Sequence, residues 1–298
     1  MKAILLGPNG QLGTDIRSAN DSRQVLNITP MGRDQLELTD FEAVKTKLSN
    51  MQFDVLINGS SYHKTDEVED NAQQAITINA HLVQLLAQIC AEKGARFVHI
   101  STDYVFGGQE ARQPLDENMG VAPLNVYGAS KVLGESLARV AHDDTLILRV
   151  ASLFGVAGAS GKGGNFVETM LRLAKERGAL RVVNDQIMSP TSTADIADAL
   201  LDMLEKSAPA GTYHVVNRGE ISWHGFASEI VKQAGLEVPV DPVPSTEFPT
   251  RAMRPPYSAL DNRKLEGAIG RPMPTWQDAL ARFMRAKGHT QRVLEAAD

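Results

Sequence analysis

Short apolar runs that alternate with helical segments constrain the fold of this chain more than any other feature. The runs are KAILLG, QVLNITP, DVLING, RFVHIS and TLILRV, which begin at residues 2, 24, 54, 96 and 145. The last two are apolar nearly throughout, as expected of strands buried on both faces. Helical segments lie between the runs, and the longest ends at Gly94, a typical helix C-cap residue. This order predicts an α/β fold with a Rossmann-like, doubly wound parallel sheet.

The charge and the cysteine content argue against several classes of protein. The net charge is −6 and there is no basic run, so neither nucleic acid nor an anionic membrane is expected as the main partner. No apolar stretch approaches the roughly 18 residues of a membrane span, and the N-terminus has no signal-peptide pattern. Cys90 is the only cysteine, so no intrachain disulfide can form. We therefore expect a cytoplasmic protein.

Three glycines directly after the first apolar run predict a dinucleotide site. Gly7, Gly10 and Gly13 form G-x-x-G-x-x-G at the start of the first helix. Glycine there permits a tight turn, a close approach of the backbone to a pyrophosphate, and close packing of the helix on the sheet. The free N–H groups of the helix N-terminus also favour an anion. A purely structural turn is the alternative, and the strand–turn–helix context favours the cofactor.

The end of the second strand indicates which dinucleotide binds. An acidic residue there binds the ribose hydroxyl of NAD(H), whereas an arginine accommodates the 2′-phosphate of NADP(H). This chain has Gly32 and Arg33 at that position, in ITPMGRDQLELTD. We therefore expect a preference for NADP(H), while Asp34 beside the arginine leaves NAD(H) open. Asp40 and Phe41 are candidates for contact with the adenine.

A threonine, a tyrosine and a lysine predict carbonyl reduction. Thr102 ends the fourth strand, at the edge where ligands bind in such sheets. Tyr127 and Lys131 are one helical turn apart and share a helix face. The ammonium of Lys131 is expected to lower the pKa of Tyr127 from its usual value of about 10. Tyr127 would then give a proton to a carbonyl oxygen held by Thr102, while the nicotinamide delivers hydride and Lys131 holds its ribose.

Six longer stretches of the sequence indicate a particular protein family. They are STDYVFGG, PLNVYGASK, GNFVETMLRLAKE, VVNDQIMSPTSTADIADAL, GTYHVVNRGEISWHGFA and RPPYSALDNRKLE. Together they resemble the dTDP-4-dehydrorhamnose reductase family of the extended short-chain dehydrogenase/reductase superfamily, over essentially the whole chain. The resemblance implies NAD(P)H-dependent reduction of the C4 keto group of a dTDP-6-deoxy-hexulose, the last step towards dTDP-L-rhamnose.

The resemblance also implies roles for individual residues. Those expected near the cofactor phosphates are Gly7, Asn9, Gly10, Gln11, Leu12 and Gly13. Those expected along the rest of the cofactor are Arg33, Asp40, Phe41, Ser61, Tyr62, His63, Tyr127 and Lys131. Those expected to face the sugar are Thr102, Asp103, Ser152 and Asn165. The catalytic residues are expected to be Thr102, Tyr127 and Lys131.

Two residues depart from the family pattern, one near the cofactor and one near the sugar. His63 stands where the family commonly has a threonine. It is interpreted as a simple hydrogen-bonding substitution, with a polar cofactor contact or an auxiliary acid as the alternatives. Ser152 stands where the family has a tryptophan that packs on the sugar, which puts the identity of the deoxy-hexulose in question. Lys162, in the glycine-rich loop FGVAGASGKGGN, is a candidate for a substrate phosphate or a solvated side chain.

A change in the sequence pattern after Val150 predicts a second domain. The glycine-rich loop leads to an amphipathic helix that begins at Phe166, and six of the 14 prolines fall between Pro239 and Pro256, which excludes a long helix there. We predict an NADP(H)-binding Rossmann domain over residues 1–152, with further elements from about 181–217. Residues 153–180 and 218–298 are predicted to form a smaller substrate-binding domain.

Other functions are weighed against reduction of a nucleotide-linked keto sugar. A 4,6-dehydratase would have Asp-Glu after the strand-end threonine, but Asp103 is followed by Tyr104. A nucleotide-sugar 4-epimerase stays open, because it uses the same three residues. A non-catalytic, NADP-binding regulatory subunit of the methionine adenosyltransferase type also stays open. No catalytic metal is expected, with Asp15 a weak magnesium candidate, and a homodimer is left open.

Overall fold

The five apolar runs form parallel strands of one central sheet in the computed structural model, which describes residues 1–109, 112–158 and 164–289. The strands are β1 (Lys2–Leu6), β2 (Asn27–Met31), β3 (Val55–Asn58), β4 (Arg96–Thr102) and β5 (Thr145–Val150). A further strand, β10 (Gly211–His214), completes the order β10-β5-β4-β3-β1-β2, with every pair parallel. The chain crosses from β2 past β1 to β3, so the sheet is doubly wound and the predicted α/β fold is confirmed.

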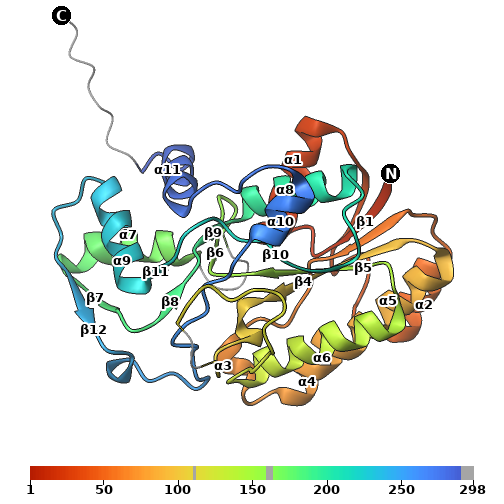
Figure 1. Ribbon diagram of the computed structural model, residues 1–298, viewed down its shortest axis with the longest axis horizontal. Coiled ribbons are helices and arrows are strands. Elements are labelled where there is room, and N and C mark those ends of the chain that lie inside the picture. Colours follow the sequence, from red (N-terminus) through yellow and green to blue (C-terminus); the bar gives the residue numbers. More distant parts are fainter. Residues whose placement is uncertain (110–111, 159–163, 290–298) are drawn as a thin grey trace, which may run out of the picture.

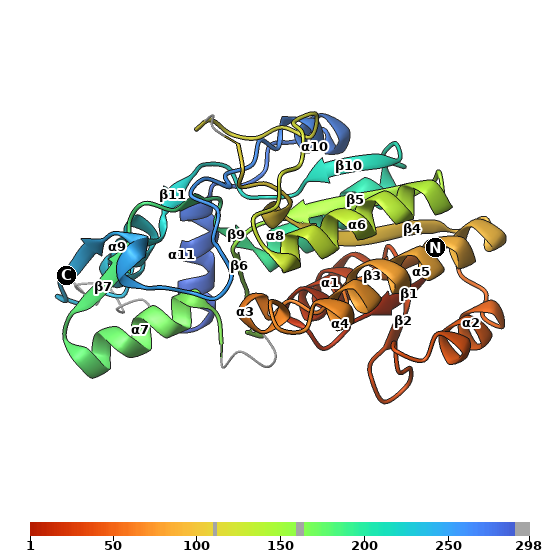
Figure 2. The same ribbon diagram turned by 90° about the horizontal axis from the view of Figure 1, so that it is seen from below.

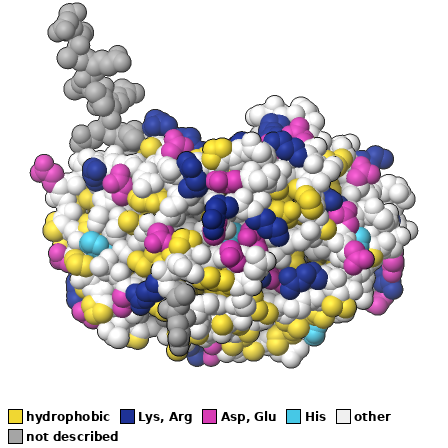
Figure 3. Space-filling view, viewed as in Figure 1, with side chains coloured by type: hydrophobic (Ala, Val, Ile, Leu, Met, Phe, Trp, Pro, Cys, Tyr) yellow, Lys and Arg dark blue, Asp and Glu magenta, His cyan; other side chains and the backbone are white. Residues whose placement is uncertain are grey.

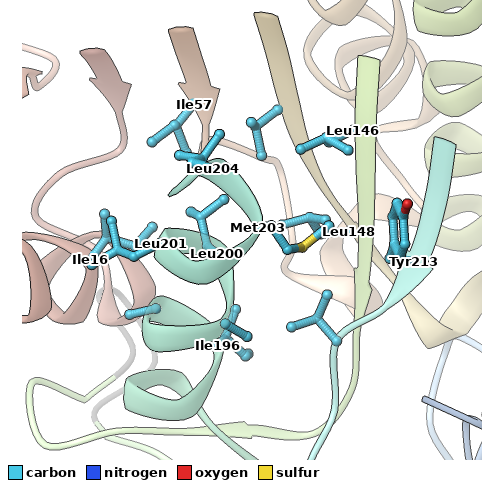
Figure 4. Packing of buried hydrophobic residues seen from close by; sticks show 14 of the residues in the cluster. Ile16, Ile57, Leu146, Leu148, Ile196, Leu200, Leu201, Met203, Leu204 and Tyr213 are labelled. Carbon is cyan, nitrogen blue, oxygen red and sulfur yellow. The ribbon is translucent and has the colours of Figure 1, made fainter. Parts of the chain in front are cut away.

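Helices cover both faces of this sheet (Figure 1). On one face lie α1 (Gln11–Arg23), α8 (Thr193–Glu205) and α10 (Arg263–Ile269). On the other face lie α2 (Phe41–Ser49), α5 (Leu82–Lys93) and α6 (Val126–Ala141). Ala3 and Leu5 of β1 enter the core under α1 and α8, whereas Ile4 and Leu6 enter the opposite core. Figure 4 shows α8 packed in this way, with Leu200 and Leu204 toward the strands. The inner strands β1, β3 and β5 are largely apolar because both of their faces are buried, whereas the edge strand β2 is mostly exposed.

A second body lies beside the sheet (Figure 2). Its elements are α7 (Phe166–Arg177), β7 (Leu180–Val183), α9 (Trp223–Gln233), β12 (Val240–Val243) and α11 (Trp276–Ala286). They enclose an apolar core in which the Phe226 ring meets Phe154 and Trp276. The proline-rich segment contains only β12 and a short 3-10 helix, η3 (Ser245–Glu247), so the predicted absence of a long helix there is confirmed. The exact bounds of the two predicted domains stay a prediction.

Shorter elements complete the fold. The helical ones are α3 (Thr65–Val68), α4 (Ala72–Ile76), the π-helix η1 (Thr77–His81) and the 3-10 helix η2 (Asp103–Val105). The extended ones are β6 (Leu153–Phe154), β8 (Ile187–Met188), β9 (Thr191–Ser192) and β11 (Ile221–Ser222). Gly94 caps α5 in the left-handed conformation, as predicted, whereas the π-helical turn before α5 was not predicted.

The surface carries charges of both signs. Acidic and basic side chains are interspersed on the face shown in Figure 3. Within residues 1–109, 112–158 and 164–289, no helix combines the length and the apolar character needed to cross a bilayer.

Candidate active site

A cavity of about 490 Å³ opens at the carboxyl ends of the central strands, between the sheet and the second body. Most of the predicted site residues line it: Gly7, Gly10, Gln11, Leu12, Gly13, Ser61, His63, Thr102, Asp103, Tyr127, Ser152 and Asn165. Residues that were not predicted also line it, among them Ile100, Ser101, Tyr104, Phe166, Thr169 and Trp223. Its volume is within the range of small-molecule sites. The cavity therefore joins the predicted phosphate loop to the predicted catalytic tyrosine.

The glycine loop between β1 and α1 has the form of an anion site. Gly10 is the N-cap of α1 and no side chain caps it, so the first N–H groups of the helix face the cavity without a capping acceptor. Gly7 has φ +74°, and a Cβ there would lie 3.0 Å from the carbonyl oxygen of Gly59. A Cβ at Gly13 would lie 2.2 Å from the carbonyl oxygen of Gly7. The loop is thus held tight by glycine and fits a pyrophosphate.

Six predicted site residues lie outside the lining of this cavity: Asn9, Arg33, Asp40, Phe41, Tyr62 and Lys131. Arg33 is exposed in the turn after β2, and the Asn9 side chain lies beside Gly32 of that turn. Asp40 caps α2 by accepting from the backbone N–H of Ala43 at 3.0 Å. Phe41 packs against the core under α2 and α5. Their contacts with a cofactor stay predictions.

Tyr127 is positioned by three hydrogen bonds around the start of α6. The side chain of Asn125 accepts from Gly128 N–H and donates to the carbonyl of Met253, both at 2.8 Å. Glu69 accepts from the N–H of Val126 at 2.8 Å. The first turn of α6 is therefore tied to α3 and to the proline-rich segment, and Tyr127 faces the cavity from a fixed position.

Asp103 is buried at the bottom of the cavity, directly after Thr102. It accepts hydrogen bonds from Thr102 Oγ1 at 3.1 Å and from Ser258 Oγ at 2.7 Å. Burial raises the pKa of Asp103 to about 6, and the hydrogen bond from Ser258 acts in the opposite direction. Ser258 belongs to the late RPPYSALDNRKLE stretch. That stretch therefore supports the site directly.

The pKa of Tyr127 is raised, whereas the sequence predicted that it would be lowered. Burial raises the pKa of Tyr127 to about 12, a hydrogen bond with Thr102 acts the other way, and the charge of Asp103 adds to the rise. Burial also lowers the pKa of Lys131 to about 7. Its Nζ lies 3.0 Å from Nε2 of His99 and donates to the carbonyl of Ile100 at 2.7 Å. Desolvation, which disfavours both charged forms, is the largest cause of both shifts.

Two polar residues of β4, His99 and Ser101, were not among the predicted site residues. His99 contacts Lys131, and Ser101 donates to Glu135 at 2.6 Å. Glu135 in turn forms a buried ion pair with Arg149 at 2.7 Å. A signal was present, because residues two apart on a strand and four apart on a helix have nearly the same spacing, about 6–7 Å. A polar pair in a buried strand needs such partners.

Three further predictions concern single residues. His63 lines the cavity, and its Nδ1 lies 3.4 Å from the carbonyl oxygen of Ser61. Asp15 accepts a hydrogen bond from Thr193, and burial raises its pKa. In the described part of the chain, no three His, Cys, Asp or Glu side chains gather where they could hold a metal ion. Lys162 lies outside the described residues.

Comparison with known proteins identifies the family. The family model of the RmlD substrate binding domain matches residues 1–288. The chain belongs to this family. It is 35% identical to a dTDP-4-dehydrorhamnose reductase of Burkholderia thailandensis, over 96% of this chain and 98% of the relative. The predicted resemblance is thereby confirmed, and the chain is an oxidoreductase of that family.

Solved structures of the family agree over the whole chain. A dTDP-4-dehydrorhamnose reductase of Clostridium acetobutylicum has a TM-score of 0.90 and 35% identity, covering 97% of this chain and 100% of its own. The reductase of Bacillus anthracis, solved in complex with NADP, has a TM-score of 0.88 and 36% identity. That comparison covers 96% of this chain and 99% of the relative.

Proposed function

We propose that this enzyme reduces the C4 keto group of a nucleotide-linked 6-deoxy-4-keto sugar with NADPH, and that Tyr127 donates the proton. The observation that carries the proposal is that the glycine loop, Thr102 and Tyr127 line one cavity. The named activity of the relatives supports the substrate class, and the NADP complex of the Bacillus anthracis enzyme supports the cofactor. Such a reaction belongs to the biosynthesis of dTDP-rhamnose or a related sugar, and a single, buried cysteine fits a cytoplasmic site.

The cofactor would be held mainly by backbone. The uncapped N-terminus of α1 offers its N–H groups to the pyrophosphate, and the tight turn at Gly7 lets the chain approach closely. Arg33, which is exposed in the turn after β2, would meet a 2′-phosphate. When bound, NADPH supplies the hydride that is added to the carbonyl carbon.

The proton comes from the protein. A pKa of about 12 keeps Tyr127 as a phenol at neutral pH, which is the form that can give a proton to the carbonyl oxygen. As the O–H bond of Tyr127 breaks, a new O–H bond forms on the sugar, and the electron pair of the carbonyl π bond accepts the proton. Thr102, whose hydroxyl lies in the same cavity, orients that oxygen by a hydrogen bond.

The sugar itself would be bound in the same cavity. Asp103, Ser152 and Asn165 line it, and so does Trp223 from the second body. Ser152 adopts a left-handed conformation, with φ +45°, and leaves room where the family has a tryptophan. We infer that the sugar is contacted on that side by Trp223.

The test is NADPH oxidation with a panel of dTDP- and other nucleotide-linked 4-keto-6-deoxy sugars. Tyr127→Phe should lower kcat by about 10²–10⁴-fold while the Kd for NADPH is unchanged. Tyr213→Phe is the control, because its hydroxyl donates to the carbonyl of Pro209 at 2.8 Å, away from the cavity. Tight NADPH binding by the wild type without turnover of any keto sugar would instead support a binding subunit. Inversion at C4 without net oxidation of NADPH would support an epimerase.

A further inference from the structure

A small side pocket adjoins the main cavity. Its volume is about 10 Å³, which is room for one water-sized group. The two spaces share four lining residues: Asp103, Tyr104, Ser152 and Trp223. Arg254 lines the side pocket but not the main cavity. The side pocket therefore has room for one small substituent of a molecule that is bound in the main cavity.

Arg254 brings an unpaired donor to this side pocket. Its Nη2 donates to Oδ2 of Asp66 at 2.6 Å, and Oδ1 of Asp66 accepts from the N–H of Ala252 at 3.0 Å. The guanidinium is thus held from one side. Its Nη1 is buried and has no hydrogen-bond partner among the residues that the structure describes. Because buried N–H groups are nearly always paired, this nitrogen points to an acceptor that a ligand supplies.

Asp103 brings an acceptor to the same side pocket. Its Oδ1 accepts from Thr102 Oγ1 at 3.1 Å, and its Oδ2 accepts from Ser258 Oγ at 2.7 Å. Each oxygen of a carboxylate has two lone pairs, so both can accept one more hydrogen bond. Burial raises the pKa of Asp103 to about 6, so the carboxylate is still the main form at neutral pH.

A hydroxyl group is complementary to both residues. One hydroxyl oxygen can accept from Nη1 of Arg254 while its own proton is donated to Asp103. A phosphate group is larger than the side pocket, and the carboxylate of Asp103 would repel it. A methyl group would leave the buried Nη1 without a partner, which is unfavourable. The chemistry of the side pocket therefore favours a hydroxyl over an anion or an apolar group.

The hydroxyl next to the reacting carbonyl is the one in reach. Asp103 follows directly after Thr102, which the function proposed above places at the C4 keto oxygen, and this inference rests on that function. In a 6-deoxy-4-keto sugar, C3 carries a hydroxyl, whereas C5 carries the methyl group. We propose that Arg254 and Asp103 together bind the C3 hydroxyl, and that the enzyme thereby selects sugars with a free hydroxyl next to the keto group.

Calorimetric titration of the full-length protein tests the proposal with four ligands: dTDP-L-rhamnose, its 3-deoxy and 2-deoxy analogues, and dTDP alone. In the wild type, loss of the C3 hydroxyl should raise the Kd about 10- to 100-fold, as expected for a hydrogen bond to charged groups. Equal Kd values for dTDP-L-rhamnose and its 3-deoxy analogue would overturn the proposal. An equally large rise for the 2-deoxy analogue would also overturn it.

Arg254→Lys removes the donor and keeps the charge. Lysine can still pair with Asp66, but it has no second arm that donates into the side pocket. The Kd for dTDP-L-rhamnose should rise about tenfold or more, while the Kd values for the 3-deoxy analogue and for dTDP change less than about threefold. A rise of the dTDP value by the same factor would place Arg254 on the diphosphate and contradict the proposal.

Arg251→Lys is the matched control. Arg251 lies three residues earlier on the same segment, and its ion pair with Asp70 is exposed and outside the side pocket. None of the four Kd values should change. If Arg251→Lys reproduces the pattern of Arg254→Lys, the charge of the whole segment, and not one buried nitrogen, accounts for the selection.

Asp103→Asn tests the same hydroxyl from the acceptor side, and it decides the question if Arg254→Lys does not fold. The amide has one acceptor oxygen where the carboxylate has two, so the Kd ratio between the 3-deoxy analogue and dTDP-L-rhamnose should fall. A ratio equal to that of the wild type would overturn the proposal. No Kd in this series needs turnover, so failure of the proposed reductase activity and failure of this proposal are distinguishable.

Discussion

The two ends of the cavity are constructed differently. The phosphate end is backbone: Gly7, Gly10 and Gly13 bend one short segment so that the N-terminus of α1 is left open to an anion. The chemical end consists of side chains that arrive from β3, β4, β5 and α6 and neutralise one another in a buried network. The first end depends on local shape and the second on desolvated charge. Mutations should therefore affect the two ends in different ways.

The largest loss of stability is expected at the chemical end. Glu135 accepts from Arg149 Nε at 2.9 Å and from Nη2 at 2.7 Å, and both side chains are almost fully buried. Glu135→Gln leaves the guanidinium without a counter-charge and should lower the free energy of unfolding by about 3–5 kcal/mol. Urea denaturation measures this loss of unfolding free energy, and the m-value should be the same as that of the wild type.

A surface ion pair supplies the control for that prediction. Arg172 and Glu176 on α7 are 2.7 Å apart, and both side chains are more than half exposed. Glu176→Gln should change the free energy of unfolding by less than about 0.5 kcal/mol. Similar losses in Glu135→Gln and Glu176→Gln would show that buried charge is not what distinguishes the chemical end.

At the phosphate end, substitutions are expected to act through steric crowding and to lower the free energy of unfolding less than at the chemical end. A Cβ at Gly13 would lie 2.2 Å from Gly7 O and 2.9 Å from the Cα of Pro8, so α1 must shift. Gly13→Ala should lower the free energy of unfolding by about 1–3 kcal/mol and weaken NADPH binding. At Gly10 the nearest atom, Gly7 O, is 3.4 Å away. Gly10→Ala should therefore weaken NADPH binding with almost no loss of stability.

Thermal unfolding and NADPH titration of the two alanine variants separate these effects. If Gly10→Ala and Gly13→Ala lose stability equally, then close packing of the helix is not the special property of Gly13. If neither variant loses NADPH affinity, the backbone of this loop does not approach the cofactor.

The difference between the two ends also explains what could be predicted from the sequence. The sheet was predictable because short, mainly apolar runs alternate with helical segments, and the glycine loop because its spacing is local. Tyr127 and Lys131 were predictable because they are one turn apart on a single helix. Each of these signals lies within about a dozen consecutive residues.

The charge states at the chemical end were not predictable in the same way. The pKa of Lys131 is lowered by burial, and its contact His99 comes from another strand; no local pattern reports either fact. The spacing of Tyr127 and Lys131 indicated an attractive pair, but desolvation reversed the expected pKa shift. Local spacing predicts position, whereas protonation depends on the completed fold.

The smallest effect is expected at the edge of the phosphate end, from the exposed Arg33. There a side chain, and not the backbone, is expected to select between NADPH and NADH. Arg33 is exposed in the turn after β2, so its contact with a 2′-phosphate would be partly solvated. Arg33→Ala should weaken NADPH binding about tenfold, the lower end for a hydrogen bond to a charged group, and leave NADH binding unchanged. Arg17 is also an exposed arginine, on α1, and Arg17→Ala is the control that should change neither affinity. Equal weakening of both dinucleotides by Arg33→Ala would mean that this guanidinium acts on the adenosine they share, and selection of NADPH would then have to come from the loop itself.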